Sequence, residues 1–291
     1  MFNNTERSVS IVIPTFNRAH LLKKTIDSAL NQSYKCEIIV CNHGSTDETD
    51  KLVNSYNDKI KYIKKIKDYG PHFCWLDGVI QATGEFIHLQ YDDDVIDNTF
   101  IEKCMALIDD ETGFSFASPK IYNPISKKYS YQDFKNFLPS TGVYLVKDYE
   151  SKLIRTLISP SAAIYRKTDV IDALYQGKLP LSKTHYHGVG PDSFITLLSM
   201  LRYKKFGYVS ENLACFLAHE GSITINASKE KETELLLINS YREVRRYYNE
   251  LKFLKKWRLF SSIFPNKYLI KDFFVSLLNR KKKYNENKTG Q

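Results

Sequence analysis

The sequence predicts an α/β domain with a mostly parallel central sheet and helices on both faces, followed by a C-terminal helical tail. In the first half, short β-branched runs alternate with segments whose apolar residues recur at helical spacing. After about Lys229 the chain becomes helical, basic and aromatic. Strands that alternate with helices favour parallel pairing, because a crossover helix returns the chain to the same end of the sheet.

The elements of the first half are expected in a regular order. A β-branched strand over 8–13 leads into a helix over 19–31. Further strands are expected over 37–41, 60–63 and 85–90, and further helices after a turn at 44–47 and over 72–82. Ser45 or Thr46 is the expected N-cap of the helix after the turn.

The second half is less regular. The segment 114–144 is rich in Tyr and Lys and is either a strand extension or a loop. A strand region is expected over 154–166, a helix over 192–202 and a strand over 213–218. The expected division is therefore a main domain, 1–228, and a basic amphipathic helical tail, 229–291.

Positive charge is concentrated near the C-terminus. The net charge is +9, yet residues 242–283 hold thirteen Lys or Arg and three Asp or Glu, a local charge of +10. The rest of the chain therefore sums to about −1. A basic tail favours an anionic surface as its partner. A nearly neutral main body argues against a nucleic-acid-binding protein, whose affinity would depend on many cationic contacts to phosphates.

The cysteines and the apolar runs indicate the compartment. The five cysteines are odd in number and lack CxxC spacing, which favours unpaired thiols in a reducing compartment. The chain opens on a short polar stretch, unlike a signal peptide. No apolar run approaches the roughly 20 residues that a spanning helix needs. We therefore expect a cytoplasmic protein, free or peripheral on the cytoplasmic face of a membrane.

Polar segments follow the expected strands at the point where each strand ends. They are Pro14, the pair Asn42 and His43, Asp68, and the triplet over 92–94. In parallel α/β sheets, ligands bind beyond the carboxyl ends of the strands. These four segments therefore predict one binding site at that edge of the sheet.

The triplet Asp92, Asp93 and Asp94 is the strongest local signal. Three adjacent carboxylates repel one another, and a hard divalent cation such as Mg²⁺ removes the repulsion. The alternative is a solvated acidic turn that caps a helix beginning near Asp97. The position of the triplet at the ligand-binding edge favours the metal site.

Two downstream residues are candidates for the same site. Asp192 begins a helix behind a Gly-containing segment, where a carboxylate is either a general base or a helix N-cap. His185, His187 and Glu220 are the next candidates for a base. His219 follows an apolar strand, and it is either a structural histidine or a further metal ligand.

Several motifs, taken in order, resemble those of the family-2 glycosyltransferases, which have the Rossmann-like GT-A fold. The opening over 10–18 reads SIVIPTFNR, the turn over 44–47 reads GSTD, and the acidic triplet stands where that family has its DXD-like metal motif. Further matches are Gly70, Gly78, Ala82, Thr83, Gly84 and Glu85. The resemblance covers about residues 8–110, with weaker similarity near Asp192 and His219.

The resemblance implies a donor half over 8–110, an acceptor half over 111–228 and an inverting transfer of a sugar from a nucleotide sugar. The donor would be bound by Pro14, Thr15, Phe16, Asn17, Arg18, Asn42, His43, Asp68, Gly70 and Asp92. A divalent metal, Mn²⁺ or Mg²⁺, would be held by Asp93, Asp94 and His219, with the outer pair Asp92 and Asp94 as the alternative carboxylates and the diphosphate as the alternative partner of His219. Asp192 would be the catalytic base. A UDP-sugar is the favoured donor. The acceptor would be a glycan or a lipid-linked molecule in the assembly of a bacterial surface polysaccharide or glycolipid.

The sequence departs from the family pattern at two places. Asn42 and His43 stand where the family usually has two acidic residues, so the identity of the nucleotide base is open. Trp75 and Leu76 stand where the family often has Arg and Asn, so a cation near the diphosphate is either absent or supplied elsewhere. These departures leave room for a non-catalytic nucleotide-sugar-binding module. A nucleotidyltransferase or a dehydrogenase is disfavoured, because no Gly-rich phosphate loop or GxGxxG follows the first strand.

The tail over 241–284 interleaves cations with large apolar residues, and Pro265 divides it into two helical stretches. Each stretch is too short and too charged to span a bilayer, which favours a position in the membrane interface. Two alternatives are packing of the aromatic face on the main domain and oligomerisation through it. The oligomeric state is left open.

Overall fold

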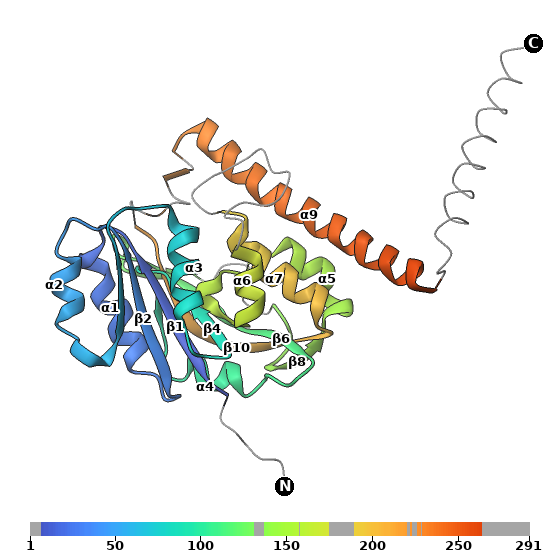
Figure 1. Cartoon of the computed structure of the whole chain (residues 1–291), viewed down its shortest axis with the longest axis horizontal. Coiled ribbons are helices and arrows are strands. Elements are labelled where there is room, and N and C mark those ends of the chain that lie inside the picture. Colours follow the sequence, from blue (N-terminus) through green and yellow to red (C-terminus); the bar gives the residue numbers. More distant parts are fainter. Residues whose placement is uncertain are drawn as a thin grey trace, which may run out of the picture. The chain divides into compact units, whose positions relative to one another are not determined.

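The structure is a computed structural model of the 291-residue chain, and it describes residues 7–130, 137–156, 158–174, 189–219, 222, 226–227 and 229–263 (Figure 1). The chain divides into two compact units, Met1–Tyr248 and Asn249–Gln291. The first unit contains the sheet and its covering helices, and it extends beyond residue 228 into helix α9 (Lys231–Ile263).

A single sheet forms the centre of the first unit. Among the described residues its strand order is β3-β2-β1-β4-β9-β6-β10-β5, with β7 paired to β6 and β8 to β10. The strands are β1 (Val9–Thr15), β2 (Cys36–His43), β3 (Lys61–Lys65), β4 (Phe86–Leu89), β5 (Val95–Ile96), β6 (Thr112–Asn123), β7 (Lys128–Ser130), β8 (Gly142–Leu145), β9 (Ala163–Arg166) and β10 (Lys205–Leu217).

The first four strands are parallel, as the alternating pattern predicts. Strand β1 pairs in parallel with β2 and β4, and β2 pairs in parallel with β3. Beyond β4 the sheet is mixed: β9 is antiparallel to both β4 and β6, whereas β6 and β10 are parallel. The Tyr- and Lys-rich segment after residue 114 contributes strands rather than a loop, since β6, β7 and β8 all lie between Thr112 and Leu145.

Helices cover both faces of the sheet. The helices are α1 (Ala19–Leu30), α2 (Thr49–Asn54), α3 (Pro71–Gln81), α4 (Phe100–Met105), α5 (Val146–Arg155), α6 (Lys167–Leu174) and α7 (Pro191–Arg202), with short 3₁₀ turns at Asn57–Lys59 and Pro160–Ala162. Alternate residues of a strand point to opposite faces. Ile11 and Ile13 share a core with Leu22 of α1 and Phe100 of α4, whereas Val12 faces α3.

Helix α3 lies unusually close to the sheet because of Gly78. A Cβ atom at this position would lie 2.4 Å from Cγ1 of Val12, so no larger residue fits without a shift. The helix begins at Pro71, directly after Gly70, whose φ of 96° lies in the left-handed region that favours glycine. This close approach brings the first turns of α3 against the ends of β1 and β2.

The turn after β2 differs from the expectation in its cap. Helix α2 begins at Thr49, and the Asp47 carboxylate accepts a hydrogen bond from the Thr49 amide at 3.1 Å. Ser45 and Thr46 do not cap this helix and instead contact Asn17: Ser45 Oγ accepts from the Asn17 amide at 2.9 Å, and Asn17 Oδ1 accepts from the Thr46 amide at 2.7 Å. These contacts tie the turn to the loop after β1.

The N-terminal part of α9 belongs to the first unit and packs there. Val244 and Tyr248 are buried. Tyr248 donates a hydrogen bond to Glu150 of α5 at 2.6 Å, and Arg245 donates to the Ile154 carbonyl at 3.0 Å. Within the residues described, no helix is long and apolar enough to cross a membrane. The expected second helical stretch after Pro265 lies outside the described residues.

Candidate active site

A cavity of about 650 Å³ opens at the carboxyl ends of the parallel strands. Most of the predicted site residues line it, from both halves of the domain: Pro14, Thr15, Phe16, Arg18, His43, Asp68, Asp92, Asp93, Asp94 and Asp192. Asn17, Asn42, Gly70 and His219 are not among its lining residues. The cavity therefore brings together the donor-side residues and the predicted base.

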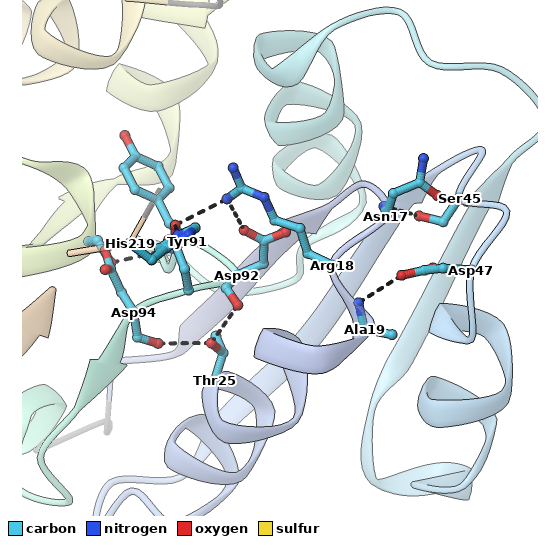
Figure 2. Close-up of polar contacts among 12 residues, drawn as sticks. Asn17, Arg18, Ala19, Thr25, Ser45, Asp47, Tyr91, Asp92, Asp94 and His219 are labelled. Carbon is cyan, nitrogen blue, oxygen red and sulfur yellow. Dashed lines mark hydrogen bonds and ion pairs between the residues drawn. The ribbon is translucent and has the colours of Figure 1, made fainter. Parts of the chain in front are cut away.

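The acidic turn after β4 is held by a buried hydroxyl. Thr25 of α1 donates hydrogen bonds to the backbone carbonyls of Asp92 and Asp94, at 3.0 and 2.9 Å (Figure 2). Because one hydroxyl bridges two carbonyls, the turn has a fixed shape and presents its carboxylates to the cavity. Asp92 and Asp94 are buried.

Arg18 and His219 contact the carboxylates of this turn. Arg18 Nη1 lies 3.0 Å from Asp92 Oδ1 and 3.1 Å from Asp93 Oδ2. His219 Nε2 lies 2.9 Å from the same Asp93 oxygen. His219 therefore reaches the acidic turn although it does not line the cavity.

The electrostatics of the turn fit a divalent cation. Burial raises the pKa of Asp92 to about 6, although Arg18 acts in the opposite direction. Burial also raises the pKa of Asp94 well above its ordinary value, although hydrogen bonds from Ser161 and the Leu217 amide oppose this. Keeping crowded, buried carboxylates charged costs free energy, and binding a hard cation removes this cost. Carboxylate oxygens suit Mg²⁺ and Mn²⁺.

Asp192 lies in the first turn of α7, where Gly190 rather than Asp192 is the N-cap. Its Oδ1 accepts hydrogen bonds from the Gly190 and Ser193 amides at 2.8 and 2.7 Å. Burial raises the pKa of Asp192, although these amides act in the opposite direction. A carboxylate with a raised pKa is a stronger base, and the contacts on Oδ1 leave Oδ2 for a proton donor in the cavity.

Sequence reasoning named Phe16 and Trp75 but missed two other aromatic residues of the cavity, Tyr91 and Tyr241. Trp75 and Tyr91 stack with ring centroids 5.6 Å apart, and both line the cavity. Tyr241 also lines it, although it comes from α9, a segment that the sequence suggested as a membrane-binding tail. Tyr91 could have been suspected from its position directly before the acidic triplet, but nothing in the sequence signals that Tyr241 folds back to the cavity.

The turn residues Asn42 and His43 are buried and make contacts inside the protein. The Asn42 amide donates to Tyr62 at 2.7 Å, and its oxygen accepts from the Ser45 amide at 2.9 Å. His43 Nε2 lies 3.1 Å from Asp77 Oδ2. Asn42 thus shapes the turn, while His43 lies at the cavity wall.

Three weaker candidates cannot be placed. His185, His187 and Glu220, the alternative bases, lie outside the described residues. Among the described residues, the predicted base Asp192 lines the same cavity as the acidic turn. Together, the fold and the cavity define the class of an α/β domain with a ligand-binding site at the carboxyl ends of its parallel strands.

The family follows from the sequence match. The model of "Glycosyl transferase family 2" matches residues 10–172, more than half of the chain. The chain therefore belongs to glycosyl transferase family 2, which confirms the resemblance seen in its motifs.

Curated relatives are similar over a limited region. The "GalNAc(5)-diNAcBac-PP-undecaprenol beta-1,3-glucosyltransferase" of Campylobacter jejuni is 41% identical over 91 residues, 30% of this chain and 29% of that protein. An uncharacterized glycosyltransferase of Rickettsia prowazekii is 46% identical over 82 residues, 23% of this chain and 26% of that protein. The chain thus matches only between a quarter and a third of the length of these two relatives.

Solved structures are similar over most of the chain. Staphylococcus aureus TarS 1–349 in complex with UDP aligns with a TM-score of 0.58 and 20% identity, over 80% of this chain and 65% of that one. Pyrobaculum calidifontis mannosyltransferase PcManGT, in complex with GDP-Man and Mn²⁺, aligns with a TM-score of 0.52 and 15% identity, over 88% and 81%. At these identities the similarity shows the fold, and it confirms the GT-A architecture.

Proposed function

We propose that this protein is a metal-dependent, inverting glycosyltransferase that moves a sugar from a nucleoside-diphosphate sugar to an acceptor hydroxyl. The observation that carries the proposal is that one cavity is lined by both the acidic turn Asp92–Asp94 and the carboxylate of Asp192. An acidic turn that suits a metal–diphosphate complex and a separate base are the two groups that a direct displacement needs.

In this mechanism Asp192 takes the proton of the acceptor hydroxyl. The acceptor oxygen then forms a bond to the anomeric carbon while the bond from that carbon to the diphosphate oxygen breaks, so the configuration inverts. Asp93, Asp94 and His219 are the proposed ligands of a Mn²⁺ or Mg²⁺ ion. When bound, that ion would stabilise the negative charge on the departing diphosphate.

Arg18 is the proposed cation for the diphosphate. It lines the cavity and contacts Asp92 and Asp93 at about the distance of a charge-assisted hydrogen bond. Once these carboxylates contact a metal, the guanidinium can turn to a phosphate oxygen. Arg18 would then replace the cation that the family often has where this chain has Trp75 and Leu76.

The donor is proposed to be a UDP-sugar packed against the loop over 14–18 and the turn at Asn42 and His43. TarS structures in complex with UDP and UDP-GlcNAc support uridine, whereas the PcManGT complex with GDP-Man shows that the fold also accepts guanosine. The Trp75–Tyr91 stack is a flat apolar wall of the same cavity.

The acceptor is proposed to be a glycan or a lipid-linked sugar used in a bacterial surface polysaccharide or glycolipid. The support is the similarity to the Campylobacter jejuni enzyme, whose name describes an undecaprenol-linked acceptor. Such an acceptor places the reaction at a membrane. We therefore propose that the protein is peripheral on the cytoplasmic face.

The C-terminal part of α9 is the proposed membrane contact. Phe253, Leu254 and Trp257 are exposed. They are interleaved in the sequence with the cations Lys255, Lys256 and Arg258. Apolar side chains interleaved with cations favour an anionic membrane interface. The part of α9 up to Tyr248 packs within the first unit and is not part of the proposed membrane contact.

A donor screen tests the proposed function. Intact protein is heated with UDP- and GDP-sugars, each with and without Mn²⁺, and the melting temperature is recorded; ligand binding to the folded state raises it. Release of nucleoside diphosphate is then measured with the best donor and lipid-linked glycans. A shift that requires Mn²⁺ together with sugar transfer is expected. A shift without transfer to any acceptor would favour the non-catalytic binding module, and no shift with any donor would overturn the proposal.

A further inference from the structure

A second cluster of metal-ligating side chains lies beside the cavity, separate from the acidic turn. Cys41, His43 and Cys74 are buried, and one ligand atom from each lies within 4.8 Å of the others. Cys41 and His43 are two residues apart on β2, so both point to the same face of the sheet. Cys74 is on α3, the helix that Gly78 allows to approach that face.

The orientation of His43 indicates a ligand. The side chain is 1% exposed, and its Nε2 is held by Asp77 Oδ2 at 3.1 Å. Its Nδ1 is buried without a well-formed hydrogen bond among the residues described, and the ring also interacts with the Cys41 thiol. A histidine that binds a metal through one nitrogen usually donates the other N–H to a carboxylate, which is the arrangement of His43 and Asp77.

We propose that Cys41, His43 Nδ1 and Cys74 bind a thiophilic divalent metal ion, with Zn²⁺ as the fitting ion, and that Asp77 positions the His43 ring. Two sulfurs and one imidazole suit Zn²⁺, whereas the oxygen-rich acidic turn suits Mn²⁺ or Mg²⁺. The two sites therefore select different ions. Metal binding displaces the thiol protons. Cys74 Sγ, which donates a hydrogen bond to the Cys41 carbonyl at 3.0 Å in this structure, gives up that bond when it binds the metal.

The cavity supplies the remaining coordination position. His43 and Cys74 line the cavity, whereas Cys41 does not. Three protein ligands with a fourth position open to water or a small ligand is the arrangement of non-structural zinc sites. The inference does not depend on glycosyl transfer, because it rests on these four residues alone.

Cobalt binding tests the site. The intact, reduced, metal-free protein is titrated with Co²⁺, and thiolate-to-cobalt charge-transfer absorption is recorded and then reversed with Zn²⁺. One equivalent is expected for the wild type, with the band lost in Cys41→Ser and Cys74→Ser. Cys36→Ser and Cys215→Ser remove thiols outside the cluster and should leave the band unchanged. Asp93→Asn should also leave it unchanged, because that carboxylate belongs to the other site.

Asp77→Asn keeps the test decisive if the buried cysteine variants fail to fold. Asp77 is partly exposed, with 32% of its side chain accessible, so the protein should tolerate the change. Loss of a carboxylate that orients a metal-bound histidine typically weakens metal binding about 10–100-fold, and Asp58→Asn, at an exposed site away from the cluster, should not. The proposal is overturned if the folded wild type shows no charge-transfer band, or if Asp77→Asn and Asp58→Asn bind Co²⁺ equally well.

Discussion

His219 Nε2 lies 2.9 Å from Asp93 Oδ2, and 126 positions of sequence separate the two residues. Asp93 follows β4 in the first half of the chain, and His219 follows β10 in the second half. Strand β10 lies beside β5, which comes directly after the acidic turn, and this antiparallel pairing brings the two halves together. The proposed metal site is therefore assembled from residues that follow β4 and β10, which β9 and β6 separate in the sheet.

Asp93→Asn should weaken the response to the metal and lower the activity. The variant removes the carboxylate that both Arg18 and His219 contact, so charge on the leaving diphosphate loses its stabilisation. We expect kcat to fall by on the order of 10²–10³. Transfer is measured against Mn²⁺ concentration, with Asp110→Asn, an exposed carboxylate paired with Arg7, as the control. Undiminished turnover of the metal-free wild type in excess chelator would show that no such ion is needed.

Asp192→Asn should retain donor binding and lose turnover. The amide cannot take a proton from the acceptor hydroxyl, so kcat should fall by about 10²–10⁴. Donor affinity is measured by thermal shift and kcat by nucleotide release, with the surface change Asp172→Asn as the control. If Asp192→Asn turns over at nearly the wild-type rate, the base lies elsewhere.

The pH profile should report the burial of Asp192. Burial raises the pKa of this carboxylate, and the base works only when deprotonated. Activity should therefore fall on the acid side as pH drops through the raised pKa, above the ordinary Asp value of about 3.9. The profile of kcat against pH for the wild type checks this. An acid limb at or below the ordinary Asp value would contradict the assignment.

Asp92→Asn should stabilise the metal-free protein above pH 6 while it weakens activity. Burial raises the pKa of folded Asp92 to about 6, against about 3.9 in the unfolded chain. Between these two pKa values the folded state binds more protons than the unfolded chain, so the free energy of unfolding falls as pH rises. The destabilisation caused by the buried Asp92 charge is complete above pH 6. Removing the charge should therefore add about 1–3 kcal/mol at pH 7.

Urea unfolding of the metal-free wild type and Asp92→Asn at pH 4 and pH 7 measures this effect. The free energy of unfolding of Asp92→Asn should exceed that of the wild type at pH 7 and nearly equal it at pH 4. Asp58→Asn should show no gain at either pH. A loss of stability at pH 7 in Asp92→Asn would mean that the Arg18–Asp92 pair outweighs the desolvation of the carboxylate.

The double change Lys255→Glu and Lys256→Glu should weaken binding to anionic vesicles. Each basic residue near an anionic surface contributes about 1 kcal/mol, so at least a tenfold loss is expected at low salt. Flotation of the intact chain with anionic and neutral vesicles measures it, with Lys51→Glu on α2 as the control. Equal flotation of the double variant and the wild type, or no flotation of the wild type, would remove the membrane role.

The sequence predicts the parallel part of the fold well, because its strands are continuous apolar runs and its helices have one apolar stripe. Local sequence patterns indicate these elements before any packing is known. They are the apolar runs of β1, β2 and β4 and the apolar stripe of α1. Helix α5 was not predicted, since most of it lies between the Tyr- and Lys-rich segment that ends at residue 144 and the strand region expected from residue 154. Its buried residues are only Val146 and Leu153, too few to signal a helix before the packing partners are known.

The candidate site was predictable where it follows strand ends and was not predictable where it depends on distant packing. Arg18 and the acidic turn follow strands of the parallel sheet, so their convergence can be deduced. Tyr241 reaches the cavity only because α9 packs on the domain, and Cys74 meets Cys41 only because Gly78 lets α3 approach the sheet. No local pattern encodes either contact.

The family match ends at residue 172, yet Asp192, His219 and Tyr241, which complete the site, all come later in the chain. The Campylobacter jejuni enzyme is similar over 91 residues, which is 30% of this chain. In this chain the residues that complete the cavity therefore lie in a segment that the family model does not match, so membership of the family alone does not define the composition of that cavity wall.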